Sequence, residues 1–160
     1  MRIALGSDDE APVVEVLAEE IARLGHLVVR VAEHQEWPEV GLEVGAAVAC
    51  GRADMGVVCC WTGTGVAIAA NKVSGIRAAL CTDVATAAGA RRWNDANVLA
   101  LSLRLTSSEV AREVLQAFVG TSVDPAETPV IARVEYRVTG TMCAMPASGV
   151  VQVEHPSLEE

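Results

Sequence analysis

The sequence predicts an α/β protein, in which a parallel sheet is covered by helices on both faces, and three observations support this prediction. The 160 residues suffice for one domain with a sizeable core. Short runs of branched apolar residues alternate along the chain with segments of helical periodicity. Those runs are apolar throughout, which is typical of strands that are buried on both faces.

Five segments have the composition of such strands, and helical patterns separate them. The expected strands are residues 2–6, 26–31, 55–60, 76–81 and 98–102. Apolar residues recur at helical spacing over 11–24, and Gly25 suits the C-terminal end of this helix. Pro38 and Gly51 mark the two ends of the second helix. The other helices are expected over 65–72, over 83–92 with Asp83 as the N-cap, from Ser107 or Ser108 to 119, and from Thr128-Pro129 to 136.

The C-terminal part differs in composition from the rest. Residues 1–137 are expected to form one domain, because no boundary interrupts the alternation of strands and helices. After Arg137 the chain is rich in Gly, Ser, Thr and Pro, with the pattern of an isolated strand over 150–154. Residues 138–160 are therefore expected to be an extension that either clasps a partner chain or is mobile.

The composition argues against several functional classes. The formal net charge of −9 leaves no basic footprint for nucleic acid. No apolar stretch approaches the length of a membrane span, and no charged-then-apolar leader precedes the first strand. The five cysteines are odd in number and form no C-x-x-C pair, which predicts reduced thiols in the cytoplasm. The three histidines lack ligand spacing, so no metal site is expected.

The stretch CCWTGTGVAIAANK, residues 59–72, joins an apolar strand to an alanine-rich helix. Gly63 and Gly65 allow a tight turn in which successive backbone N–H groups point into one small volume. Together with the positive end of the helix dipole, such a pocket suits a phosphate or the oxyanion of a reacting carbonyl. The same dipoles favour the thiolate of a cysteine at the rim, which can attack a carbonyl or remove a proton from the carbon beside it.

The two cysteines of this stretch should differ, because neighbours on a strand face opposite ways. A cysteine that ends a buried strand is usually a small core residue, and we expect this of Cys59. The local pattern leaves Cys60 open between core and pocket. In parallel sheets ligands bind beyond the carboxyl ends of the strands. There we expect Ser7-Asp8-Asp9, Trp37, Cys60-Trp61-Thr62, Thr82-Asp83 and Trp93-Asn94.

Four motifs give the chain a resemblance to a known family. They are IALGSD at 3–8, CWTGTGVAIAANK at 60–72, GIRAALCTD at 75–83 and NDANVL at 94–99. In order and spacing they resemble the sugar-phosphate isomerases of the type B ribose-5-phosphate isomerase and galactose-6-phosphate isomerase family, over about residues 2–119. The resemblance implies a three-layer, doubly wound (Rossmann-like) domain with a five-stranded parallel sheet. It also implies a homodimer or a tetramer with active sites between subunits, and aldose–ketose isomerisation through a cis-enediolate without metal or cofactor.

The resemblance further implies roles for single residues. Cys60 matches the base that moves a proton between C1 and C2, and Thr62 matches the hydroxyl that assists it. The backbone of Gly63, Thr64 and Gly65 matches the hole for the enediolate oxygen. The other matches are Asp8 with an acid that contacts sugar hydroxyls, Asn94 with a polar residue beside the substrate, and Arg104 and Arg133 with members of an arginine cluster.

The departures from the family pattern have a common consequence: the expected site suits a phosphate less and offers more aromatic surface. Asp9 replaces a histidine that binds the phosphate, and Trp93 replaces one that helps to open the sugar ring. Trp61 occupies the position of a family glycine, and Trp37 occupies that of a family tyrosine. Pro129 lies near the position where the arginine cluster of the family has a partner of Arg133. Asp9 would repel a phosphate. The tryptophans offer flat faces for a sugar or an aglycone, although each could equally belong to the core or to a dimer contact.

Three functional hypotheses follow. The first is an isomerase of a sugar phosphate or a related small sugar, with an open-chain substrate such as a tetrose favoured by the loss of the ring-opening histidine. The second is a non-catalytic or regulatory sugar-binding subunit of a hetero-oligomeric isomerase. The third, a hydrolase with a cysteine nucleophile, has little support because no histidine falls near Cys60 at the matching strand ends.

Overall fold

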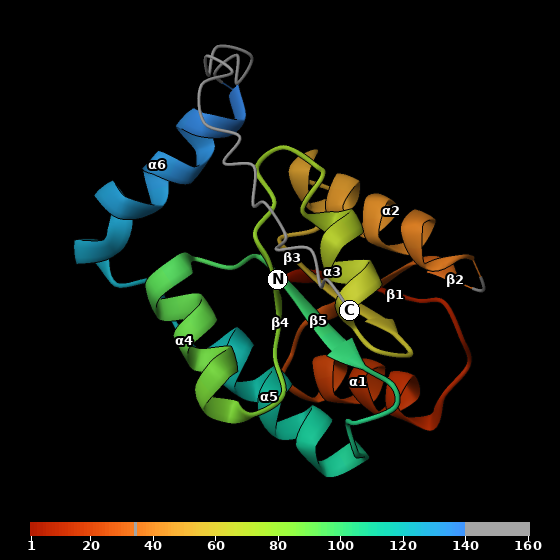
Figure 1. The fold of residues 1–160 in the computed structure, drawn as a ribbon. Coiled ribbons are helices and arrows are strands. Elements are labelled where there is room, and N and C mark those ends of the chain that lie inside the picture. Colours follow the sequence, from red (N-terminus) through yellow and green to blue (C-terminus); the bar gives the residue numbers. More distant parts are fainter. Residues whose placement is uncertain (34, 140–160) are drawn as a thin grey trace, which may run out of the picture.

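The computed structural model describes residues 1–33 and 35–139 of the chain. Five strands form one parallel sheet in the order β2-β1-β3-β5-β4 (Figure 1). Their bounds are β1 Arg2–Ser7, β2 Leu27–Glu33, β3 Met55–Cys60, β4 Ala78–Leu80 and β5 Val98–Ser102. The predicted doubly wound α/β fold is confirmed. From residue 140 on, the predicted extension lies outside the described residues, and so does the strand expected over 150–154.

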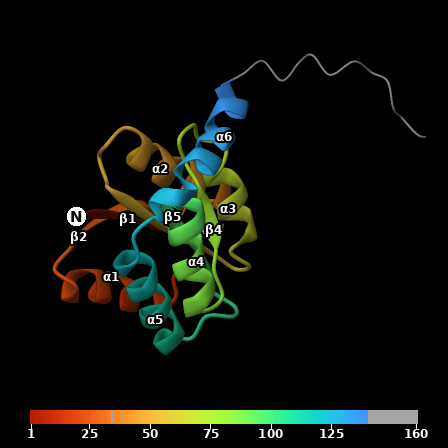
Figure 2. The same cartoon turned by 90° about the vertical axis from the view of Figure 1, so that its left-hand side faces the viewer.

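Helices cover both faces of the sheet (Figures 1 and 2). The helices are α1 Pro12–Arg23, α2 Trp37–Ala49, α3 Thr64–Ala70, α4 Val84–Asn94, α5 Ser108–Gly120 and α6 Thr128–Thr139. One core cluster joins the sheet to α1, α4 and α5, and includes Leu17, Leu99 and Phe118. The second joins the other face to α2 and α3, and includes Val44, Val58 and Val66. The three central strands β1, β3 and β5 are therefore buried on both sides, as their composition predicts, whereas the edge strands β2 and β4 are partly exposed.

The predicted helix caps are confirmed at two positions. The carboxylate of Asp83 accepts the N–H of Thr86 at 2.8 Å, and this hydrogen bond lowers the pKa of Asp83. Ser107, the first of the two alternatives, accepts the N–H of Val110 at 3.3 Å. The cap expected at Thr128 is wrong. Asp124 instead caps a 3-10 turn, η1 Pro125–Glu127, that leads directly into α6. Figures 1 and 2 show α6 extending away from the sheet.

Three strands differ in length from the prediction, and the first of them, β1, is longer by one residue because it includes Ser7. β4 is shorter, because side chains replace the strand ladder at its start: Asn97 accepts the N–H of Arg77 at 2.9 Å, and Asn71 accepts that of Ala78 at 2.8 Å. β2 is longer and continues through Ala32, whose φ of 51° lies in the left-handed region. The pairing register between β1 and β2 shifts at this point, as it does at a β-bulge.

The helices α2 and α3 pack unusually closely because α2 carries a glycine at the contact. A Cβ atom added to Gly41 would lie 2.5 Å from Ala69 Cβ and 2.7 Å from the carbonyl oxygen of Val66. Real side chains do not approach this near, so any larger residue at position 41 must push the helices apart.

Substitution of Gly41 by alanine should therefore destabilise the protein. We expect the free energy of unfolding, measured by chemical denaturation, to fall by about 1–3 kcal/mol, the usual cost of overpacking a core. Gly120→Ala is the matched control in another helix, because a Cβ there meets no atom within 4 Å. Equal effects of the two substitutions would contradict the close contact between α2 and α3.

Candidate active site

The carboxyl ends of β1, β3 and β5 bring the central group of predicted residues together. Leu103 and Arg104, just after β5, donate their N–H groups to the carbonyls of Cys60 and Trp61 at 2.9 and 3.1 Å. Asp8, after β1, donates its N–H to the carbonyl of Cys59 at 3.3 Å. β1 and β3 are neighbours, but the chain continues from them to opposite sides of the sheet, which makes this edge a topological switch point.

Cys59 and Cys60 face opposite sides of the sheet, as expected. Cys59 is fully buried in the cluster beneath α1, α4 and α5. Burial, with smaller contributions from Cys60 and Asp8, raises the pKa of Cys59 to about 12. Cys60 belongs to the cluster beneath α2 and α3 and is 4% exposed. As the last residue of β3, it is the cysteine that leads into the glycine turn. Cys59 is therefore a core residue, and Cys60 adjoins the turn.

Gly63 shapes the turn between β3 and α3. Its φ of 74° is left-handed, and a Cβ there would lie 2.5 Å from Leu80 Cδ1. Its N–H donates to the carbonyl of Cys60 at 3.2 Å, so this amide closes the turn. Since α3 begins at Thr64, the amides of Thr64 and Gly65 have no carbonyl one turn earlier in the helix. The hydroxyls of Thr62 and Thr64 are hydrogen-bonded to each other at 2.7 Å.

A half-buried acid, Asp8, lies at the same edge of the sheet, directly after β1. Asp8 Oδ1 is inaccessible to solvent and has no hydrogen-bond partner among the described residues. Burial, followed by the charge of Asp9, raises the pKa of Asp8. An enclosed carboxylate oxygen without a hydrogen-bond partner is uncommon in folded proteins, and it marks Asp8 as a candidate functional residue.

Ser102 is a residue of this edge that the sequence interpretation missed. Its hydroxyl donates to the carbonyl of Trp61 at 2.9 Å and accepts the N–H of Leu105 at 3.2 Å. It thereby fixes the backbone that follows Cys60. A buried hydroxyl as the last residue of an otherwise apolar strand was the available signal.

Two tryptophans and an arginine also lie at this edge. Trp37, the first residue of α2, packs on Gly65: a Cβ added to Gly65 would lie 2.9 Å from the indole atoms Cδ2 and Cε3. Trp37 is 44% exposed and Trp61 is 63% exposed, so both offer ring surface to solvent. Arg104 is exposed beside Trp61.

Trp93 and Asn94 do not lie at the carboxyl edge, which corrects the expectation above. α4 continues through Asn94 and carries both residues back to the amino ends of β4 and β5. There the carbonyl of Asn94 accepts a hydrogen bond from Arg77 Nε at 3.1 Å. Trp93 and Asn94 line a cavity of about 480 Å³ together with Val130 and Val134 of α6. Arg133 is exposed on the same helix.

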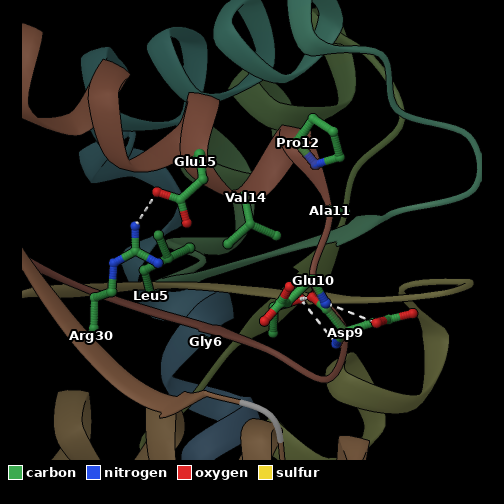
Figure 3. A pocket seen from close by; sticks show the side chains of 10 residues that line it. Leu5, Gly6, Asp9, Glu10, Ala11, Pro12, Val14, Glu15 and Arg30 are labelled. Atoms are coloured by element: carbon green, nitrogen blue, oxygen red, sulfur yellow. Dashed lines mark hydrogen bonds and ion pairs between the residues drawn. The ribbon is translucent and has the colours of Figure 1, made fainter.

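Asp9 lines a different cavity, of about 410 Å³, on the α1 side of the sheet (Figure 3). Leu5 and Val14 belong to the core cluster of that face, opposite to the cluster of Cys60. Arg30 lies in this cavity and is paired with Glu15 at 2.7 Å. Asp9 Oδ1 accepts the N–H of Glu10 at 2.8 Å. The lining is thus rich in carboxylates, which is unfavourable for a phosphate.

The described residues contain no group of three or more histidine, cysteine, aspartate or glutamate side chains that could hold a metal ion. Within the same residues, no helix combines the length and the apolar character needed to cross a membrane.

Comparison with known proteins identifies the family. Residues 3–135 match the family described as Ribose/Galactose Isomerase. The chain belongs to this family. It is 40% identical to ribose-5-phosphate isomerase B of Escherichia coli K12 over 89 residues, which are 56% of this chain and 60% of that protein. It is 34% identical over 132 residues to the galactose-6-phosphate isomerase subunit LacB of Clostridium acetobutylicum, covering 79% of this chain and 76% of that one.

Two more comparisons extend this picture of the family. A D-erythrulose-4-phosphate isomerase of Pectobacterium atrosepticum is 41% identical over 86 residues, 54% of this chain and 57% of that protein. The match thus spans about 60% of the length of two of these three relatives. Ribose-5-phosphate isomerase B of Clostridium thermocellum has the same fold, with a TM-score of 0.82 and 32% identity, over 86% of this chain and 97% of that one.

The reactivity of the cysteines other than Cys60 tests the burial and the hydrogen bonds that set their pKa values. Cys50 is exposed, and the hydrogen bond from Arg52 Nε to its sulfur at 3.3 Å lowers the pKa of Cys50. Burial raises the pKa of Cys81 to about 11. Because the thiolate is the reactive form, iodoacetamide should alkylate Cys50 in the folded protein at neutral pH and spare Cys59 and Cys81. Peptide mapping by mass spectrometry measures each rate.

The control for this experiment is Arg52→Ala. Loss of the guanidinium should move the pH–rate profile of Cys50 to higher pH, while Cys59 and Cys81 stay unmodified. Alkylation of Cys59 as fast as that of Cys50 would contradict the burial described above.

Proposed function

We propose that the protein is an aldose–ketose isomerase of a sugar phosphate or a related small sugar, with Cys60 as the base. The observation that carries this proposal is the position of Cys60, the last residue of β3, directly before the turn through Gly63 into α3. Membership of the Ribose/Galactose Isomerase family supports it. The described cysteines are free, which supports a reducing, cytoplasmic location.

The proposed reaction moves one proton between neighbouring carbons. The Cys60 thiolate removes the proton from C2 of the aldose, and the C2–H electron pair forms the double bond of an enediolate. The negative charge moves to O1, where the amides at the start of α3 stabilise it. The hydroxyl of Thr62 passes the proton of O2 to O1. The thiol then returns its proton to C1, which gives the ketose. The stabilising charge comes from N–H dipoles, so the proposal needs neither metal nor cofactor.

The proposed site is completed by a second copy of the chain. Cys60, Thr62 and Asp8 lie at the carboxyl edge of the sheet, whereas Trp93 and Asn94 lie at the amino edge, with Arg133 on the nearby α6. One chain cannot bring both groups to one substrate. A two-fold homodimer solves this, because each carboxyl edge then meets the amino edge of the partner, in two equivalent sites.

The substrate is proposed to be small and open-chain. A four-carbon aldose or ketose phosphorylated at C4 cannot close a five-membered ring, so it needs no ring-opening residue at position 93. The likeness to a D-erythrulose-4-phosphate isomerase supports this choice. The carboxylates near Asp9 argue against a phosphate in that cavity. Arg104 at the carboxyl edge, with Arg133 from the partner, is the alternative cationic contact.

The isomerase proposal predicts that the protein exchanges a substrate proton with solvent and that Cys60→Ala loses this exchange. With a four-carbon sugar phosphate in D₂O, the protein should incorporate one deuterium stereoselectively at C1 or C2, as measured by NMR. Cys60→Ala should lower this rate by at least about 100-fold, the lower range for a general base. Cys59→Ala, which changes the neighbouring core cysteine, should keep the rate within a few-fold. Full exchange in Cys60→Ala would refute the mechanism.

The shared site predicts that two inactive variants restore each other. Cys60→Ala and Asn94→Ala each remove a side chain from both sites of a homodimer. When the two are unfolded, mixed and refolded together, half of the dimers contain one of each chain, with one intact site. Activity should recover to about a quarter of the wild-type value. No recovery, with mixed dimers verified by native mass spectrometry, would mean that each chain forms its own site.

A non-catalytic or regulatory subunit is the second candidate. It is favoured by the match to LacB, which is named as a subunit and aligns over more of this chain than the other two relatives. The carboxylate at Asp9 and the indole at Trp93 would then be remnants of a site that needs an unequal partner. Titration of the pure protein with a sugar-phosphate panel separates the candidates. Binding without turnover until a second chain is added would favour the subunit.

A further inference from the structure

We propose that Trp37 is a specificity-determining residue that limits the carbon-chain length of the substrate to about four carbons. This inference rests on the proposed function and concerns the same site. It starts from the seam between α2 and α3, in which three contacts repeat every four residues along both helices. Trp37, Gly41 and Gly45 of α2 lie against Gly65, Ala69 and Val73 on or just after α3.

The small residues in this seam force the helices together. A Cβ on Gly41 would lie 2.5 Å from Ala69 Cβ, and one on Gly45 would lie 3.0 Å from Val73 Cγ2. At the carboxyl edge the glycine and the larger residue change places between the helices: the larger residue, Trp37, is on α2 and the glycine, Gly65, is on α3. The indole of Trp37 fits there only because position 65 has no side chain. Its place over the turn is therefore set by packing along the whole seam.

Cys60 lies beneath the same seam. It shares a core cluster with Val40 of α2 and Val66 of α3, and is 4% exposed. Trp37 is the first residue of α2 and Gly65 the second of α3, so their contact lies at the carboxyl edge, at the end of the turn that begins after Cys60. In the proposed site, a substrate held by the amides of Thr64 and Gly65 has its remaining carbons against the indole that packs on Gly65.

The size of the side chain at position 37 then decides how much chain fits. Trp37 packs on Gly65 and is 44% exposed, so in the proposed site it acts as a wall with a free apolar surface. Sugar C–H groups can pack against such a surface. A smaller side chain would leave room for at least one further carbon without touching the backbone amides or Cys60. Removal of the indole should therefore change selectivity more than it changes catalysis.

The test compares four- and five-carbon substrates across variants of position 37. In the wild type, kcat/KM should be higher for a four-carbon aldose phosphate than for a five-carbon one. In Trp37→Ala the five-to-four ratio should rise at least about tenfold, the discrimination that one carbon unit commonly carries in a fitted pocket. Trp37→Tyr keeps an aromatic ring on Gly65 and should give a smaller rise. Leu42→Ala, also exposed on α2, should leave the ratio unchanged.

A binding measurement separates this inference from the isomerase proposal. Dissociation constants of four- and five-carbon polyol phosphates, measured by calorimetry, should show the same shift in Trp37→Ala. The shift without any turnover by the wild type would support the role of Trp37 and refute the isomerase. Turnover by the wild type with an unchanged ratio in both variants would overturn the role of Trp37. Absence of both turnover and polyol binding would refute both proposals.

Discussion

The left-handed conformation of Gly63 is the constraint on which the candidate site depends. A side chain at this position would meet Leu80 Cδ1 at 2.5 Å and the carbonyl carbon of Leu101 at 2.9 Å. The chain can therefore leave β3, pass over the end of β5 and enter α3 within three residues only because position 63 is glycine. The same turn keeps Cys60, the threonine hydroxyls and the first amides of α3 within one small region.

The two ends of the sheet carry different parts of the family motifs. At the carboxyl edge, side chains are held through their backbones, as Ser102 holds Trp61. At the amino edge, Asp95 pairs with Arg77 and with Arg91 at 2.8 Å each, and this ion-pair group fixes the end of α4 that bears Trp93. The NDAN motif thus has a structural part, Asp95 and Asn97, beside the exposed Asn94 that we propose for a shared site.

The sequence predicts the sheet well because its strands are continuous apolar runs with no competing interpretation. It also predicts the opposite environments of Cys59 and Cys60, since alternation along a strand depends only on local geometry. It fails at Trp93 because the helix between two parallel strands runs back to their amino ends, so residues that lie between α4 and β5 in the sequence belong to the amino edge of the sheet and not to the carboxyl edge. The hydrogen bond from Ser102 to the carbonyl of Trp61 joins residues far apart in the sequence, so the partner of this hydroxyl could not be predicted, whereas the cap at Asp124 is a local bond to the N–H of Ala126 that the sequence interpretation overlooked.

The central claim is that the sulfur of Cys60 and the amides after Gly63 face one reacting sugar. The most direct measurement is a crystal structure with a four-carbon hydroxamate, a stable mimic of the enediolate. The account predicts hydroxamate oxygens at hydrogen-bond distance from the first amides of α3, about 3 Å, with the carbon chain against Cys60 Sγ. A hydroxamate bound in the cavity of Asp9 instead, with Cys60 still buried and out of contact with it, would contradict it.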